Sequence, residues 1–179
     1  MKGIVFNLLE ETITEEFGLG AWDNLLDIAG LDGAYTSLGS YPDGEIFNLV
    51  AAASTVLGKT QAEILRWFGR RAMPYLAQRY PAFFEAQQTG RDFILSVNHI
   101  IHPEVRKLYA GAGCPHFHFR EPSVDTLIIG YQSPRKLCDL AHGFIEGAAD
   151  RYGEQVTVEH LACMNRGDHN CQIAVAWVS

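Results

Sequence analysis

The sequence predicts an α+β fold, in which a helical N-terminal lobe packs on a helix and an antiparallel sheet of about four strands. Apolar residues recur at helical spacing through the first two thirds of the chain. After Gly113 the pattern changes to alternation, in short segments rich in β-branched and aromatic residues. The 179 residues, 47% of them hydrophobic and 20% charged, suffice for a domain with its own core.

Glycines and capping residues mark where the predicted helices begin and end. Gly30 and Gly58 suit the left-handed position that ends a helix, and Thr60 with Glu63 forms a capping box before the next one. We therefore expect helices over about residues 4–13, 22–29, 43–58, 61 onward, 81 onward, 92–109 and 134–151. The expected strands are PHFHFR, DTLIIGY, QVTVEHLACM and NCQIAVAWVS.

Charge and hydropathy exclude several classes of partner. The net charge is -7 and basic residues form no run, so a nucleic-acid partner is not expected. No apolar stretch reaches the roughly 18 residues of a membrane span, and two early glutamates, Glu10 and Glu11, argue against a signal peptide. We expect a cytoplasmic protein whose four cysteines are thiols or metal ligands, not a disulfide framework.

Two histidines on one predicted helix are the first candidates for chemistry. His99 and His102 are three residues apart, so both can lie on one side of the helix. A lone histidine is more often an ordinary hydrogen-bonded or exposed side chain than a ligand. His102, however, has apolar neighbours and precedes Pro103, which removes a backbone donor, so the helix should kink or restart there.

The segment YQSPR indicates an anion site. It joins a predicted strand to a predicted helix, with Ser133 as the helix cap and Pro134 in the first turn. The start of a helix presents free N–H groups, to which Tyr131 adds a hydroxyl and Arg135 a guanidinium. An ordinary capped helix with a surface arginine explains each residue alone, but the combination favours a bound carboxylate or phosphate.

These residues resemble those of the H-NOX family, the heme nitric oxide/oxygen binding sensors related to the heme domain of soluble guanylate cyclase. YQSPR is similar to the family's YxSxR signature, and the likeness extends from MKGIVFNLLEE through HIIHPEVRKLY to YQSPRKLC and the final strand pair. The resemblance implies a single heme domain over residues 1–179, with a distal helical lobe of about 1–60, a proximal lobe of about 61–179 and heme b between them.

The resemblance also implies which residues hold the heme. His102 matches the ligand of the iron, because it keeps the family's spacing to Pro115, whereas His99 lies one turn earlier. Tyr131, Ser133 and Arg135 match the residues that bind the heme propionates. The matching role of Pro115 is to pack against the porphyrin and distort it. Pro103, after the ligand, departs from the family pattern.

The distal side decides which gas binds. Oxygen-binding members have a tyrosine five residues beyond the motif arginine, where this chain has Leu140. Without that donor the protein should bind nitric oxide, and also CO, in preference to oxygen. Tyr75 and Gln78 remain possible donors. The other residues that match the distal wall are apolar, although plain core packing explains them equally well: Val5, Leu9, Pro74 and Phe144.

A second group of residues has the composition of a zinc site. A hairpin centred on Gly167 places Cys163 opposite Cys171, while His160 lies nearby on the strand and Cys138 at the start of the last helix. Three thiolates and one imidazole satisfy tetrahedral zinc, and a subset of H-NOX proteins is similar in having such a site. Free buried cysteines and a disulfide between Cys163 and Cys171 are the alternatives.

The function that the resemblance implies is that of a noncatalytic sensor, in which nitric oxide releases His102 from the iron. Because the sequence ends just after a strand, we expect a separate partner, either a sensor histidine kinase or a cyclic-di-nucleotide signalling enzyme. A thiol and zinc redox sensor is the alternative function. A heme enzyme is disfavoured, because the distal matches offer no histidine and arginine pair. Cys114, His116 and His118 receive no role.

Overall fold

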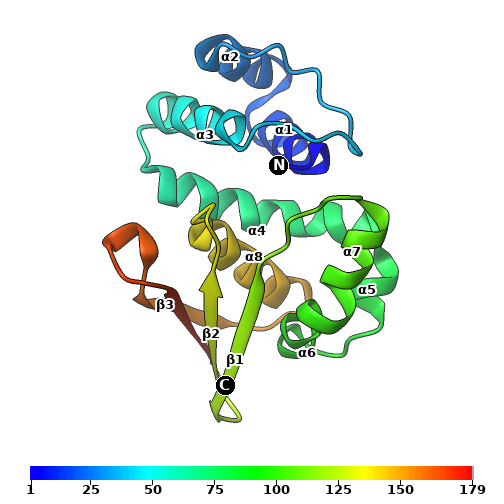
Figure 1. Ribbon diagram of the computed structural model, residues 1–179, viewed down its shortest axis with the longest axis vertical. Helices are drawn as coiled ribbons and strands as arrows, with labels where there is room; N and C mark the ends of the chain where they lie inside the picture. Colours follow the sequence, from blue (N-terminus) through cyan, green and yellow to red (C-terminus); the bar gives the residue numbers. More distant parts are fainter. Residues whose placement is uncertain (179) are drawn as a thin grey trace.

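The computed structural model describes residues 1–178, and its N-terminal part is helical as expected. Three helices lie together at the top of Figure 1, and the first and third of them pack on one long helix below. Their bounds are α1 (Gly3–Phe17), α2 (Leu19–Ala29), α3 (Asp43–Leu57) and, for the long helix, α4 (Gln61–Arg79). The capping box predicted for α4 is formed. The hydroxyl of Thr60 accepts a hydrogen bond from the N–H of Glu63, and the carboxylate of Glu63 accepts one from the N–H of Thr60.

The long helix α4 and the last helix α8 (Cys138–Arg151) approach each other unusually closely. A Cβ atom at Gly143 would lie 2.0 Å from the carbonyl oxygen of Arg66, and one at Gly69 would lie 2.4 Å from that of Leu140. Only residues without a side chain fit at these crossing points. The two helices thus form a rigid pair between the N-terminal helices and the sheet (Figure 1).

The helix predicted over 92–109 is interrupted just before His102. It consists of α6 (Gly90–Ser96), a π-turn η1 (Val97–Ile101) and α7 (His102–Leu108), and follows the short α5 (Pro81–Glu85). The N–H of His102 donates to the carbonyl of Val97, five residues back. Pro103 explains this turn, because it has no N–H and its ring clashes with a regular helix before it. The prediction of a kink or restart beside Pro103 is met by this π-turn, although the backbone of His102 itself is helical, with φ -63° and ψ -38°.

The sheet has four antiparallel strands in the order β1-β2-β4-β3. They are β1 (His116–Ser123), β2 (Thr126–Gln132), β3 (Val156–Ala162) and β4 (Cys171–Trp177), followed in Figure 1 from green to red. Ala162 pairs with Gln172 at the end of β3, so Cys163 and Cys171 come next on the two strands. The α+β class and the four strands are confirmed.

The start of α8 differs from the prediction. We expected the helix from Pro134, but it begins at Cys138. Lys136 has φ 51°, a left-handed conformation that ends any helix begun at Pro134. The hydroxyl of Tyr131 accepts the N–H of Leu137 and the hydroxyl of Ser133 accepts that of Arg135, so the YQSPR segment is a turn closed on its own side chains and not a helix N-terminus.

Two groups of buried apolar residues form the core. One joins α1, α2, α3 and the first part of α4, and the other joins α5, α6, the inner face of the sheet and α8. Helix α4 contributes Phe68 to the first group and Met73 to the second. Across residues 1–178, no helix combines the length and the apolar character that crossing a bilayer requires.

Candidate functional site

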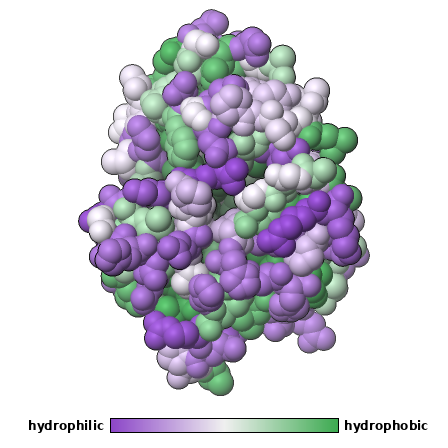
Figure 2. All heavy atoms as spheres, in the orientation of Figure 1, coloured by the Kyte–Doolittle hydropathy of each residue, from purple (hydrophilic) through white to green (hydrophobic). Residues whose placement is uncertain are grey.

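A cavity of about 560 Å³ lies between the two apolar groups. Residues of α1, α4, α7, α8 and the inner face of β1 and β2 line it, and most of them are apolar. On the face drawn in Figure 2, hydrophilic side chains surround a narrow recess between the helical half and the sheet half of the molecule. A cavity of this size and lining is typical of sites for a large, mostly apolar ligand.

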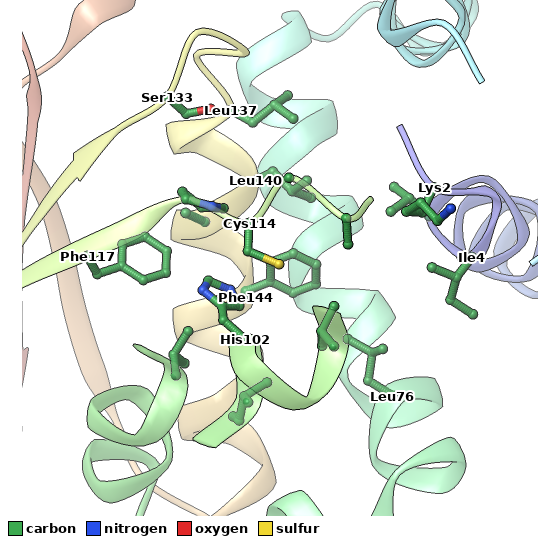
Figure 3. A pocket seen from close by; sticks show the side chains of 18 of the residues that line it. Lys2, Ile4, Leu76, His102, Cys114, Phe117, Ser133, Leu137, Leu140 and Phe144 are labelled. Carbon is green, nitrogen blue, oxygen red and sulfur yellow. The ribbon is translucent and has the colours of Figure 1, made fainter. Parts of the chain in front are cut away.

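His102 is the only histidine among the lining residues of this cavity in the described chain. Figure 3 shows its ring leaving α7 and pointing into the cavity beside Cys114 and Phe144, and the ring also packs on Phe117 with centroids 5.7 Å apart. Burial, reinforced by Arg106 and partly opposed by the Pro115 carbonyl, lowers the pKa of His102 to about 4. The imidazole is therefore neutral at pH 7, as a metal ligand must be.

One ring nitrogen of His102 lacks a partner. Nδ1 is buried and forms no hydrogen bond with any of residues 1–178. A buried polar atom without a partner costs about 1–3 kcal/mol. Packing and the π-turn therefore hold the ring. Nε2 is the second ring nitrogen and is available to bind a ligand.

The three motif residues of YQSPR also line the cavity. Tyr131 and Ser133 are buried and Arg135 is half-buried. Burial raises the pKa of Tyr131, so its hydroxyl keeps its proton and can donate it. Together the three side chains supply two hydroxyl donors and a guanidinium at one wall of an apolar cavity, which is a site for a carboxylate.

The guanidinium of Arg135 is held from both sides. Its Nε donates to Asp43 at 2.7 Å and its Nη1 donates to the Gly113 carbonyl at 2.8 Å. Asp43, at the start of α3, also accepts from the N-terminal ammonium of Met1 at 2.6 Å. Burial opposes ionisation of Asp43, but the ammonium and Arg135 outweigh it and lower its pKa. Arg135 still has three of its five N–H donors for another anion.

The predicted packing residues divide into two sets. Pro115, Val5, Leu140 and Phe144 line the cavity, together with Ile4, which Figure 3 shows on the side of α1.

Leu9 and Pro74, which were expected in the distal wall, do not line the cavity. Leu9 is buried in the N-terminal core, where the helical period turns it away while Val5 and Leu8 face the cavity. Pro74 lies on the exposed face of α4, and its neighbour Met73 points inward.

Sequence reasoning missed a pair of tyrosines in the cavity wall. Tyr80, at the end of α4, and Tyr109, after α7, both line the cavity and their hydroxyls bond to each other. A helical pattern gives no sign of such a pair, because the residues are brought together only by the turn through α5 to α7. Tyr75, considered as a donor to bound gas, instead donates to Glu15 outside the cavity. Gln78 is exposed.

A cluster of sulfur atoms lies one strand away from the polar wall of the cavity, where Cys171 of β4 pairs with Tyr131 of β2. The Sγ atoms of Cys138, Cys163 and Cys171 lie within 4.8 Å of one another, and those of Cys138 and Cys163 are 3.5 Å apart. A tetrahedron of zinc–sulfur bonds of about 2.3 Å has edges of about 3.8 Å, so the spacing fits such an ion. All three are buried free thiols, so the disulfide considered for Cys163 and Cys171 is not formed.

Hydrogen bonds and burial define the chemistry of this sulfur cluster. The N–H of Met164 donates to Sγ of Cys171 at 3.2 Å, and the Asn165 amide donates to Sγ of Cys138 at 3.6 Å. Burial raises the pKa of the Cys138 and Cys171 thiols. Buried sulfurs of this kind stay protonated unless a cation replaces their protons, so the cluster suits a dication.

Histidines adjoin the cluster. A ring nitrogen of His160 lies within 4.8 Å of Sγ of Cys138 and of a carboxylate oxygen of Asp139, but not within that distance of all three sulfurs. His142 on α8, which sequence reasoning did not identify, lies with its Nδ1 3.2 Å from Nε2 of His160. Burial, with Arg66 as the next cause, lowers the pKa of His142 to about 4. The remaining histidines named above, His99, His116 and His118, are exposed and line neither site.

The cavity fits a heme. Its volume and apolar wall suit a porphyrin, its single neutral histidine suits an axial ligand, and its one polar wall suits carboxylate groups. The fold and this cavity together define the class of protein, which is an α+β domain with an internal site suited to heme.

Comparison with known proteins identifies the family. The model of the haem-NO-binding family matches residues 2–160, so this chain belongs to that family. Domains of the family are sensors rather than enzymes.

Solved structures agree with this assignment. An H-NOX protein from S. oneidensis in the Fe(II)NO ligation state is 29% identical, with a TM-score of 0.93 and 100% of both chains covered. An H-NOX domain from Shewanella oneidensis in the Fe(II)CO ligation state is 28% identical, with a TM-score of 0.90, and the match covers 100% of this chain and 99% of that one. An H-NOX protein from K. algicida, 22% identical with a TM-score of 0.89 over 100% of this chain and 97% of that one, shares the fold.

Proposed function

We propose that this protein binds heme b through His102, takes up nitric oxide at the ferrous iron and signals the event to a separate partner protein. The observation that carries the proposal is the single neutral histidine in an apolar cavity whose opposite polar wall is built from YQSPR. The similar S. oneidensis protein in the Fe(II)NO state supports nitric oxide as the gas. When bound, the heme supplies an iron site for a diatomic gas.

The chain's own residues have three tasks in this proposal. His102 presents Nε2 to the iron from α7, where the π-turn and the ring of Phe117 fix its direction. Tyr131, Ser133 and Arg135 hold the propionates by donating hydrogen bonds to their oxygens. Pro115 packs against the porphyrin. The apolar wall excludes water from the gas site.

The proposed gas preference follows from the distal wall. Val5, Leu140 and Phe144 offer no hydrogen-bond donor. Tyr80 and Tyr109 share one hydrogen bond, in which one hydroxyl donates its proton to the other. Oxygen depends on a donor for tight binding, whereas nitric oxide and CO depend mainly on the iron.

Absorption spectra of the reduced, heme-loaded protein under each gas test this preference. We expect the Soret band to shift with nitric oxide and with CO and to stay in place under oxygen. A stable spectrum of an oxygen complex would contradict the proposed preference.

Signalling requires that the two lobes, about 1–60 and 61–179, move relative to each other when the gas binds. The Arg135–Asp43 ion pair spans them, so Arg135 would connect the propionate-binding wall of the cavity to α3. We infer that a sensor histidine kinase or a cyclic-di-nucleotide signalling enzyme reads this shift in the cytoplasm, and that this chain has no catalysis of its own. Kinase or cyclase activity measured with added protein, with and without nitric oxide, tests the link, and equal activity in both states would refute it.

A zinc site of three cysteines and one histidine is a second proposed feature, and the sulfur cluster favours it. Cys138, Cys163 and Cys171 converge as a tetrahedral ion needs, and His160 is the nearest imidazole. Oxidation of these thiols with loss of zinc is the route by which the site would sense redox state. Elemental analysis of the purified protein tests it: one zinc per chain is expected, and none after purification with zinc in the medium would refute it.

A further inference from the structure

A row of four polar side chains runs from the sulfur cluster along α8 to Arg66 on α4, whose side chain is half exposed. His160 on β3 contacts His142 on α8 at 3.2 Å, and Nε2 of His142 lies 3.7 Å from Oε1 of Glu146. Arg66 on α4 grips Glu146 with Nε at 2.8 Å and Nη2 at 2.5 Å. The side chains of His142 and Glu146 are about nine-tenths buried, at 8% and 10% exposed. Two buried polar side chains in contact need a reason beyond packing.

The negative charge of Glu146 determines which ring nitrogens of His142 and His160 carry protons. Glu146 stays ionised because Arg66 lowers its pKa, although burial opposes this. A carboxylate only accepts hydrogen bonds, and Nε2 is the nitrogen of His142 that faces Glu146, so the geometry favours the tautomer with the proton on Nε2. Nδ1 of His142 is then an acceptor, and the nitrogen that faces it, Nε2 of His160, must carry a proton in turn.

The remaining nitrogen of His160 therefore has a free lone pair. We propose that His142 is a positioning residue which, with Glu146 and Arg66 behind it, holds His160 in the tautomer that presents Nδ1 to a zinc ion bound by Cys138, Cys163 and Cys171. This inference rests on the zinc site proposed above and adds the residues that orient its histidine. Nε2 of His142 has no hydrogen-bond partner among the described residues, and the nearest carboxylate oxygen is Oε1 of Glu146 at 3.7 Å.

Residues behind a metal ligand commonly fix its ring in this way, and their loss lowers metal affinity by about 10- to 100-fold. The row also ends on α4, whose Phe68 lines the heme cavity. Both sites are consequently anchored to one helix.

Zinc affinity is the first test, measured on the full-length chain by competition with a chromophoric chelator. His142→Leu should weaken zinc binding by about 10- to 100-fold. His142→Asn, whose Oδ1 takes the place of Nδ1 and can still accept from Nε2 of His160, should retain most of the affinity. His118→Leu, at an exposed histidine, is the matched control and should leave the affinity unchanged.

The outcomes separate this inference from the zinc site itself. Wild-type protein that binds no zinc overturns both. Wild-type protein that binds zinc, with His142→Leu equal to it, overturns only the role of His142.

The tautomer is tested without any variant, so the inference stays falsifiable if His142→Leu does not fold. In nitrogen-15-labelled protein loaded with cadmium-113, we expect a cadmium coupling to Nδ1 of His160 and a protonated Nε2. A coupling to Nε2, or no coupling to His160 because Asp139 takes its place, would contradict the inference.

Discussion

The heme cavity and the sulfur cluster are both buried, yet they are built in opposite ways. The cavity is an open space of about 560 Å³ with one histidine and a polar wall, whereas the cluster is a filled space in which three sulfurs lie within 4.8 Å of one another. A large cofactor needs volume and a few fixed contacts, while an ion needs only converging donors. The two regions nevertheless share α8, which gives Leu140 and Phe144 to the cavity and Cys138 to the cluster.

The largest expected effect separates the two sites. Cys171→Ser removes one of three sulfurs, and we expect zinc content to fall from one per chain to nearly none, because a closed site loses most of its binding free energy with a ligand. Heme content should stay at the wild-type level. Metal analysis and the Soret absorbance of the same sample measure both. A parallel loss of heme would mean that the cavity depends on the cluster.

The helix pair beneath both sites gives the next effect. Gly143→Ala places a Cβ atom 2.0 Å from the Arg66 carbonyl, so α4 and α8 must separate. We expect the free energy of unfolding to fall by about 1–3 kcal/mol, as for an overpacked core. Chemical denaturation measures it. Gly44→Ala, at an open position in α3, is the control, and an equal effect of the two changes would contradict the close contact.

The buried imidazole of the cavity should make stability depend on pH. In the heme-free chain the pKa of His102 is about 4, below its ordinary value of 6.5. Between these values the unfolded chain binds a proton that the folded chain does not, so the stability contributed by His102 falls as pH drops from about 6.5 to 4. His102→Gln should lose less stability over that window. Unfolding curves of the two chains that run parallel would refute this.

The smallest effect concerns the ion pair at the edge of the cavity. Asp43→Asn removes the partner of Arg135 and of the N-terminus, and because both groups are partly exposed we expect a loss of about 1 kcal/mol in the free energy of unfolding. Glu104→Gln, in the exposed pair with Lys107, should have less effect. A larger loss in the Glu104 variant would contradict the structure.

Local rules predicted the features that local chemistry determines. The capping box at Thr60, the restart of the helix at His102 before Pro103 and the strand pair that brings Cys163 near Cys171 were all readable from a few neighbouring residues. Each depends on hydrogen bonds within one turn or one hairpin.

Features that depend on packing between distant segments were missed or misplaced. Pro134 fits a helix start, but the N–H of Leu137 donates to the hydroxyl of Tyr131, and α8 begins only at Cys138. Pro74 matches a distal-wall position of the family, but in this structure it lies on the exposed face of α4 and does not line the cavity. Polar residues such as His142 give no pattern in the sequence, because their partners come from other elements.

The central claim is that His102 binds the heme iron, and one measurement tests it most directly. The His102→Gly variant should accumulate with little heme, and free imidazole added during expression should restore heme content and the wild-type Soret band, because the imidazole fills the space that the side chain leaves. A variant that keeps the wild-type band without imidazole would contradict the claim.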